Sequence, residues 1–136
     1  MIYKITGQPI KTESLLDEMR VETSGAIATF HGIARRPSRG RDVLYLEYSA
    51  YESMALNVLE QIGEEVYNRF EVDKVTIVHR TGRVAIGETS ILIAIAAPHR
   101  KAALEGCSYT IERIKQILPV WKKEVWNGGE EWIEGA

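Results

Sequence analysis

The feature that most constrains the fold is an uninterrupted apolar run over residues 90–97, with the sequence Ser-Ile-Leu-Ile-Ala-Ile-Ala-Ala. A strand with one face in water alternates apolar and polar residues, whereas this run is apolar at both odd and even positions. Such a segment is typical of a central strand that other elements cover on both faces. Pro98 ends the run, because proline has no N–H group to donate to a neighbouring strand. The sequence therefore predicts a sheet with this strand in its interior.

Two long segments have the periodicity of helices. In residues 52–70 the apolar side chains recur at spacings of four, three, four and four, which places them on one helical stripe: Ala55, Leu59, Ile62, Val66 and Phe70. In residues 99–118 the spacings are three, four, three and four, and the stripe consists of Leu104, Cys107, Ile111, Ile114 and Leu118. Pro119 ends this second helix. The central place of the cysteine in its stripe favours a buried, inert thiol over a reactive one.

Shorter segments predict further strands and one small helix. Alternating or β-compatible residues predict strands over residues 25–32, 43–48, 74–79, 84–86 and 120–126. Within residues 43–48, the alternation places Leu44, Leu46 and Tyr48 on one face. Thr12 is a suitable N-cap for a short N-terminal helix. Because strands and helices do not alternate strictly, we expect an α+β fold in a single domain over residues 1–136, with a mixed or antiparallel sheet, two main helices and one short N-terminal helix.

Composition and charge exclude several classes of protein. The formal net charge of −2 is unlike that of a general nucleic-acid binder, which carries an excess of Lys and Arg. Two local basic clusters, at residues 35–41 and 98–126, favour small anionic ligands over a long polyanion. The single cysteine rules out an intrachain disulfide and is typical of a reducing compartment. Because no apolar run approaches the ~20 residues that span a bilayer and the N-terminus lacks signal-peptide features, we expect a cytoplasmic protein without membrane contact.

The clearest local signal for ligand binding is the Pro98-His99-Arg100 segment between the apolar strand and the second long helix. The start of a helix presents unpaired N–H groups and a partial positive charge, so it attracts anions. Arg100 adds a planar fork of donors that suits a phosphate or carboxylate, and His99 can donate, accept or shuttle a proton near neutral pH. An ordinary solvated helix cap, in which His99 bonds a backbone carbonyl, explains the same pattern. Spacing alone leaves both interpretations open.

Two lysines near the end of the chain are ambiguous from spacing. Lys115 lies beside the apolar stripe, where its stem packs on the core and its amine reaches either solvent or a pocket. Lys122 belongs to the extended segment after Pro119, and neighbouring residues of a strand point to opposite faces. Trp121 and Lys123 therefore share one face and Lys122 takes the other. The pattern does not determine which of these faces lines a cleft.

Several segments, in the same order along the chain, resemble the large, catalytic subunit of molybdopterin synthase, the MoaE family. They are Gly-Ala-Ile-Ala-Thr-Phe-His-Gly at 25–32, Leu-Glu-Tyr-Ser-Ala-Tyr-Glu-Ser-Met-Ala at 46–55, Val-His-Arg-Thr-Gly at 78–82, Gly-Glu at 87–88, Ala-Pro-His-Arg at 97–100, Ile-Glu-Arg-Ile-Lys at 111–115 and Pro-Val-Trp-Lys-Lys-Glu at 119–124. The resemblance extends over residues 25–133, nearly the whole chain. It implies a fold of the α/β-hammerhead kind, which agrees with the expected order of elements.

The resemblance also implies an enzyme, a sulfurtransferase of molybdenum cofactor biosynthesis. Members of the family convert a cyclic pyranopterin monophosphate into molybdopterin by forming its dithiolene. The sulfur comes from a small ubiquitin-like partner subunit as a C-terminal Gly-Gly thiocarboxylate, and two partner molecules are consumed in turn. The implied assembly is a homodimer within a heterotetramer. We expect no cofactor, no metal ion and no nucleic-acid partner.

The matched positions imply roles for individual residues. Lys115 and Lys122 match the essential lysines of the family, so we expect them to be catalytic. The positions that match substrate-binding residues are Arg35, His99, Arg100, Lys123 and Glu124. Ile33 departs from the polar or basic residue that relatives often have two positions before the arginine, so it receives no binding role. The chain stops at Ala136, where some relatives continue with further basic residues, and this leaves open whether a tail contributes to a neighbouring subunit's site.

Two other classes of function fit parts of the pattern. A non-catalytic module would use the arginine-rich loop at residues 35–41 and Arg100 to hold a nucleotide or an RNA backbone, and its binding would weaken steeply with salt. The net negative charge and the lack of stacking aromatic residues beside this loop count against that module. The third class is a scaffold that docks the ubiquitin-like partner without turnover. The intact Lys115 and Lys122 argue against it.

Overall fold

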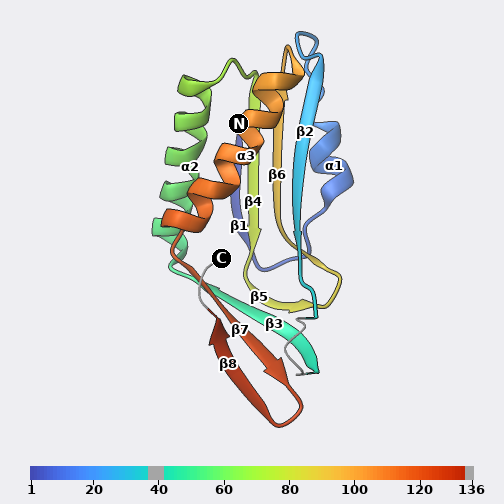
Figure 1. Cartoon of the computed structure of the whole chain (residues 1–136), viewed down its shortest axis with the longest axis vertical. Coiled ribbons are helices and arrows are strands. Elements are labelled where there is room, and N and C mark those ends of the chain that lie inside the picture. Colours follow the sequence, from blue (N-terminus) through green and yellow to red (C-terminus); the bar gives the residue numbers. More distant parts are fainter. Residues whose placement is uncertain (37–41, 134–136) are drawn as a thin grey trace.

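Two four-stranded sheets and three helices make up the described part of the chain, residues 1–36 and 42–133 of the computed structural model (Figure 1). The first half contains β1 (Ile2–Thr6), α1 (Thr12–Asp17), β2 (Ala26–Ile33), β3 (Val43–Ala50) and α2 (Glu52–Arg69). The second half contains β4 (Lys74–Arg80), β5 (Gly82–Ala85), β6 (Thr89–Ala97), α3 (Arg100–Ile117), β7 (Val120–Trp126) and β8 (Gly129–Ile133). The α+β class predicted from the sequence is confirmed. None of the described helices is long and apolar enough to cross a membrane.

The first sheet has the strand order β1-β4-β6-β2, and its interior strand β6 contains the apolar run. Strand β1 pairs with β4 in parallel, whereas β6 pairs antiparallel with both β4 and β2. Residues 90–97 are all buried, as predicted. Ile93 and Ile95 pack into the main core beneath α2 and α3, and Ala94 and Ala96 pack against Met19 on the opposite face. Both faces of β6 are therefore covered (Figure 1).

The stripe predicted for α2 is buried over four of its members, and Phe70 packs partly buried beside them. The stripe predicted for α3 is wrong at one position, because Leu104 is 62% exposed. Small residues, Ala103 and Gly106, face the core instead, together with Cys107, Thr110 and Ile114. Their size lets α3 approach β6 and α2 closely, and this rotates Leu104 towards solvent.

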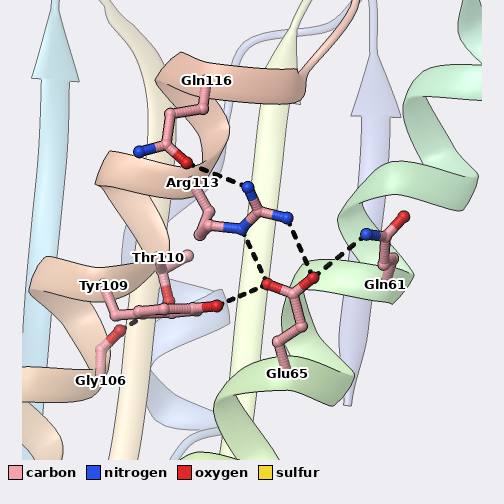
Figure 2. A network of polar contacts seen from close by, with 7 residues as sticks. All are labelled: Gln61, Glu65, Gly106, Tyr109, Thr110, Arg113 and Gln116. Carbon is pink, nitrogen blue, oxygen red and sulfur yellow. Dashed lines mark hydrogen bonds and ion pairs between the residues drawn. The ribbon is translucent and has the colours of Figure 1, made fainter.

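A polar network ties α3 to α2 at the level of Glu65 (Figure 2). The Glu65 carboxylate accepts hydrogen bonds from Arg113 Nε at 2.8 Å, from Tyr109 Oη at 2.6 Å and from Gln61 Nε2 at 3.1 Å. These bonds, above all those from Arg113 and then Tyr109, lower the pKa of Glu65 to about 2. The network fixes the C-terminal half of α3, which carries Lys115, against its neighbouring helix.

The second sheet has the strand order β5-β3-β7-β8, and its strands are all antiparallel. Leu46 and Tyr48 are buried together, as predicted, but Leu44 is 50% exposed and the prediction for it is wrong. The register of β3 against β7 shifts between Val43 and Tyr45, so Val43 rather than Leu44 points into the core. One extra residue in a strand reverses the faces of the residues beyond it.

Two strands and one helix cap differ from the sequence-based expectation. Strand β1, an edge strand, was not predicted, and neither was β8. The β7–β8 hairpin turns at Asn127 and Gly128, and the positive φ of 107° at Gly128 is favourable only for glycine in such a two-residue turn. Thr12 is the first residue of α1 rather than its cap, since Lys11 holds the N-cap position without a capping side-chain bond.

Candidate active-site cleft

A cleft of about 610 Å³ lies where the second sheet meets the end of the first sheet and the last turns of α3. This volume is in the range of small-molecule sites in proteins. Its apolar lining includes Phe30, Leu46, Ile91 and Ile111. The polar and charged side chains that line it are His31, Arg35, Tyr48, His79, Ser90, Lys115, Lys122 and Glu124. Four of the residues predicted for the site are therefore brought together here.

Strand pairing explains how β7 presents its side chains to the cleft. Lys122 is the register partner of Tyr48 on β3, and Glu124 is the partner of Leu46. All four line the cleft, because alternate residues of a strand share a face and paired residues lie side by side. Glu124 is 4% exposed, so its carboxyl group is at the buried end of this face. The structure thus decides the orientation that the sequence left open: Lys122 faces the cleft.

Lys123 lies on the opposite face of β7 and does not line the cleft. Its Nζ is 3.3 Å from a Glu130 carboxylate oxygen and 3.8 Å from one of Glu47. The ammonium group also sits over the ring of Trp132, at 5.0 Å from the centroid. Trp121, on the same face, is 52% exposed. This face of the second sheet is consequently an outer surface of the chain.

Lys115 and Arg35 bring positive charge to the cleft from two other directions. Lys115 follows Ile111 by one helical turn on α3, so both side chains lie on the face that closes the cleft. Arg35 is the second residue after the end of β2. With Lys122, these residues provide three cationic side chains against one carboxyl group, that of Glu124. Cationic donors held together in a partly desolvated cleft stabilise anionic ligands and developing negative charge.

His99 and Arg100 lie at the other end of α3. His99 is the N-cap residue, with no capping side-chain bond, and Arg100 is the first helical residue. Both are exposed. At 1.5 Å per helical residue, Arg100 is about 22 Å along the axis from Lys115. Within one chain, the structure therefore does not bring this pair into the cleft.

The arginine-rich loop is described only in part. Arg36 Nε is 3.4 Å from a carboxylate oxygen of Asp42, so these two exposed residues form an ion pair. Arg39 and Arg41, which the sequence grouped with Arg35, fall in residues 37–41 and lie outside the described residues. Of the predicted basic loop, only Arg35 is therefore placed at the cleft.

His79 is a cleft residue that the sequence reasoning did not assign to the site. It is 1% exposed, its Nδ1 is 2.8 Å from the Arg80 carbonyl oxygen, and its ring packs edge-on to Tyr48 at 5.3 Å between centroids. Burial first, and the positive charges of Lys115 and Lys122 in addition, lower the pKa of His79 to about 4. A signal was present, since Val75, Ile77 and His79 alternate on β4, and a histidine at an inward position is unusual.

The cysteine does not line the cleft, and the described residues form no candidate metal centre. Cys107 is buried in the core, and burial raises the pKa of its thiol to about 11. Within residues 1–36 and 42–133, no three His, Cys, Asp or Glu side chains gather where they could share a metal ion. The chemistry that the described cleft offers is consequently that of amines, a guanidinium, two imidazoles, a carboxyl group and hydroxyl groups.

Comparisons with known proteins agree on one family. A family model described as MoaE protein matches residues 5–117. The molybdopterin synthase catalytic subunit of Bacillus subtilis is 47% identical over 131 residues, which cover 96% of this chain and 83% of that protein. The crystal structure of molybdopterin synthase from Staphylococcus aureus superposes with a TM-score of 0.93 at 41% identity, with 96% of both chains covered.

A further structural relative is a complex. The protein–protein complex of subunits 1 and 2 of the molybdopterin-converting factor from Helicobacter pylori contains a chain that superposes with a TM-score of 0.81 at 26% identity. The match covers 95% of this chain and 88% of that one. The family model, the curated relatives and the fold all lead to the same conclusion, which is that this chain belongs to the MoaE family.

Proposed function

We propose that this chain is the catalytic subunit of a molybdopterin synthase and acts as a sulfurtransferase in molybdenum cofactor biosynthesis. It converts a cyclic pyranopterin monophosphate into the dithiolene of molybdopterin. The sulfur is supplied by the C-terminal Gly-Gly thiocarboxylate of a small ubiquitin-like partner subunit. The observation that carries this proposal is the cleft itself, in which Arg35, Lys115 and Lys122 converge in a chain of the MoaE family.

The charges of the reaction fit the charges of the cleft. The substrate carries a phosphate, the incoming tail ends in an anionic thiocarboxylate, and the departing oxygens need protons. Lys115 and Lys122 neutralise the two anions while they approach each other, and their ammonium groups supply protons to leaving oxygens. Arg35 offers a planar pair of donors to the phosphate. The cleft supplies cations and no reactive thiol, so the sulfur comes from the partner's tail.

Glu124 and Lys123 have different roles in this proposal, because they lie on opposite faces of β7. Glu124 lines the cleft beside Lys122, where its carboxyl group orients the amine or binds a donor group of the substrate. Lys123 acts on substrate binding through the strand: its contacts with Glu47 and Glu130 hold β7 between β3 and β8.

His99 and Arg100 enter the same site only if a second copy of the chain provides them. They are about 22 Å along α3 from Lys115, which is further than any side chain reaches. We therefore propose a homodimer in which the start of α3 of one copy closes the cleft of the other. With one small partner subunit at each cleft the assembly becomes a heterotetramer. The two-subunit complex of the Helicobacter pylori relative supports a partner of this kind.

The test of the function is reconstitution. The chain is incubated with cyclic pyranopterin monophosphate and the thiocarboxylated small subunit, and the gain of two sulfur atoms is followed by mass spectrometry. Lys115→Ala and Lys122→Ala nearly abolish the gain while thermal unfolding stays close to wild type. Lys4→Ala, at an exposed lysine on the edge strand β1 that does not line the cleft, serves as the matched control and keeps its turnover. Full turnover in either cleft variant would overturn the lysine assignment.

The shared site is tested by mixing two inactive variants. If each cleft combines Lys115 of one copy with Arg100 of the other, a mixed dimer of Lys115→Ala and Arg100→Ala contains one intact cleft. Random reassociation then restores about a quarter of wild-type turnover, since half of the dimers are mixed and each has one working site of two. No recovery after verified exchange of subunits would show that both residues act within one copy or that Arg100 acts elsewhere.

A further inference from the structure

The floor of the cleft contains a buried imidazole whose orientation is fixed from two sides. His79 is on β4, paired with Ile5 of β1 and Ile91 of β6, and its side chain is 1% exposed. The ring packs edge-on against Tyr48 with an interplanar angle of 68°. A histidine held in this way has little freedom to rotate, so its two ring nitrogens keep separate surroundings.

The contact with Arg80 determines which ring nitrogen carries the proton. Nδ1 lies 2.8 Å from the Arg80 carbonyl oxygen, and a carbonyl oxygen only accepts hydrogen bonds. Nδ1 therefore donates, and in a neutral imidazole Nε2 is then left with its lone pair as an acceptor. The His79 side chain lines the cleft, so its acceptor nitrogen belongs to the lining of the site. A ligand in the cleft therefore meets a side chain whose second ring nitrogen is a hydrogen-bond acceptor.

The surroundings keep this imidazole neutral. Burial and the positive charges of two cleft lysines lower the pKa of His79 to about 4. The titratable and charged groups near the ring come from β2, the segment after it, β3, β4, α3 and β7, and they are His31, Arg35, Tyr48, Arg80, Lys115, Lys122 and Glu124. The positively charged lysine and arginine side chains outnumber the single carboxyl group, so the electrostatic potential at the imidazole disfavours its protonation. At neutral pH, Nε2 of His79 thus carries a lone pair that can accept a hydrogen bond and has no proton to donate.

We propose that His79 Nε2 binds an N–H or O–H group of the pterin substrate and so orients the ring system against Lys115 and Lys122. The proposal deepens the sulfurtransferase function and rests on it. Lysine and arginine side chains donate only, so they recognise the phosphate and the thiocarboxylate but not the donor groups of a pyranopterin. A neutral acceptor in the cleft floor supplies that recognition. Sites that pair a buried polar group with the substrate discriminate strongly against molecules that leave the group unpaired.

Two substitutions separate the acceptor from the packing of the ring. His79→Phe keeps an aromatic ring against Tyr48 but has no acceptor, whereas His79→Gln places an amide oxygen near the Nε2 position. We expect His79→Phe to lower kcat/KM by about 10- to 100-fold, mainly through KM, because a buried donor of the substrate loses its partner. His79→Gln recovers most of this loss. Equal losses in the two variants, with unchanged thermal unfolding, would overturn the proposal.

A measurement on the unaltered chain tests the same inference if either variant fails to fold. In ¹⁵N-histidine-labelled protein, His79 shows a protonated Nδ1 and does not titrate between pH 5 and 8, and its ring signals are assigned through the backbone resonances of the same residue. Addition of the pyranopterin monophosphate shifts the Nε2 signal. A protonated Nε2, or an Nε2 signal that saturating substrate leaves unchanged, would overturn the assignment. Absence of sulfur gain by the wild-type chain would instead refute the proposed function, and the two failures are distinguishable.

Discussion

The neighbouring lysines Lys122 and Lys123 provide the sharpest test of the site, because one strand presents them to opposite surroundings. Lys122 lines the cleft beside Lys115 and Arg35, while the Lys123 amine contacts Glu47 and Glu130 on the outer face. Removing one charged donor from a partly desolvated catalytic site costs about 2.7–4 kcal/mol of transition-state stabilisation. We therefore expect Lys122→Ala to reduce kcat about 100- to 1,000-fold.

Lys123→Ala removes only surface ion pairs, whose carboxylate partners are 44% and 58% exposed. Exposed pairs of this kind contribute about 0.2–1 kcal/mol each to folding. Even about 2 kcal/mol lost from the transition state, the upper limit for two such pairs, would slow turnover only about 30-fold. We therefore expect Lys123→Ala to lower the stability of the second sheet more than it lowers the rate of turnover.

The assay is single-turnover formation of the dithiolene with saturating thiocarboxylated partner, followed by mass spectrometry. Each variant is compared with wild type in a urea titration, so that a loss of rate is separated from a loss of fold. A 100-fold loss in Lys123→Ala at unchanged stability would refute the assignment of faces. So would a Lys122→Ala variant that keeps more than a tenth of wild-type turnover.

Three further predictions follow from the packing and the polar network. Cys107→Ala keeps near wild-type turnover and loses about 1 kcal/mol of stability, and the wild-type thiol resists an aromatic disulfide reagent at neutral pH because its pKa is about 11. The pKa of Glu65, about 2 in the folded chain, is below its unfolded value, so its stabilising effect is complete above pH ~4.3 and is lost as pH falls through 2. The Tm difference between wild type and Glu65→Gln is accordingly constant above pH ~5 and shrinks below pH ~4; a difference independent of pH contradicts this. Gly32→Ala places a Cβ 2.5 Å from an Ile91 methyl and lowers the free energy of unfolding by about 1–3 kcal/mol in urea titrations, and an unchanged value would contradict the close packing at this edge of the cleft.

Local patterns predicted those elements whose environment is uniform along their length. The apolar run at 90–97 is buried on both faces along its whole length, so the apolar residues at both odd and even positions were enough to predict its burial. The stripe of α2 was readable for the same reason. Leu44 and Leu104 were misplaced because their faces depend on a register shift in β3 and on the close approach of α3 to its neighbours. Neither the register shift nor the close approach of the helix can be predicted from the spacing of apolar residues.

The sequence alone indicated the family and made Lys115 and Lys122 candidate site residues, because both lysines lie in short segments that match the family. Which residues share a site came only from the tertiary structure. The pairing of β7 with β3 turns Lys122 and Glu124 into the cleft and Lys123 out of it, while the length of α3 separates Arg100 from Lys115. The physical reason is that a sequence specifies side-chain chemistry and local period, whereas strand pairing and helix length set the distances between charges. His79 illustrates the same division, because its chemistry becomes that of a neutral acceptor only after burial beside two lysines.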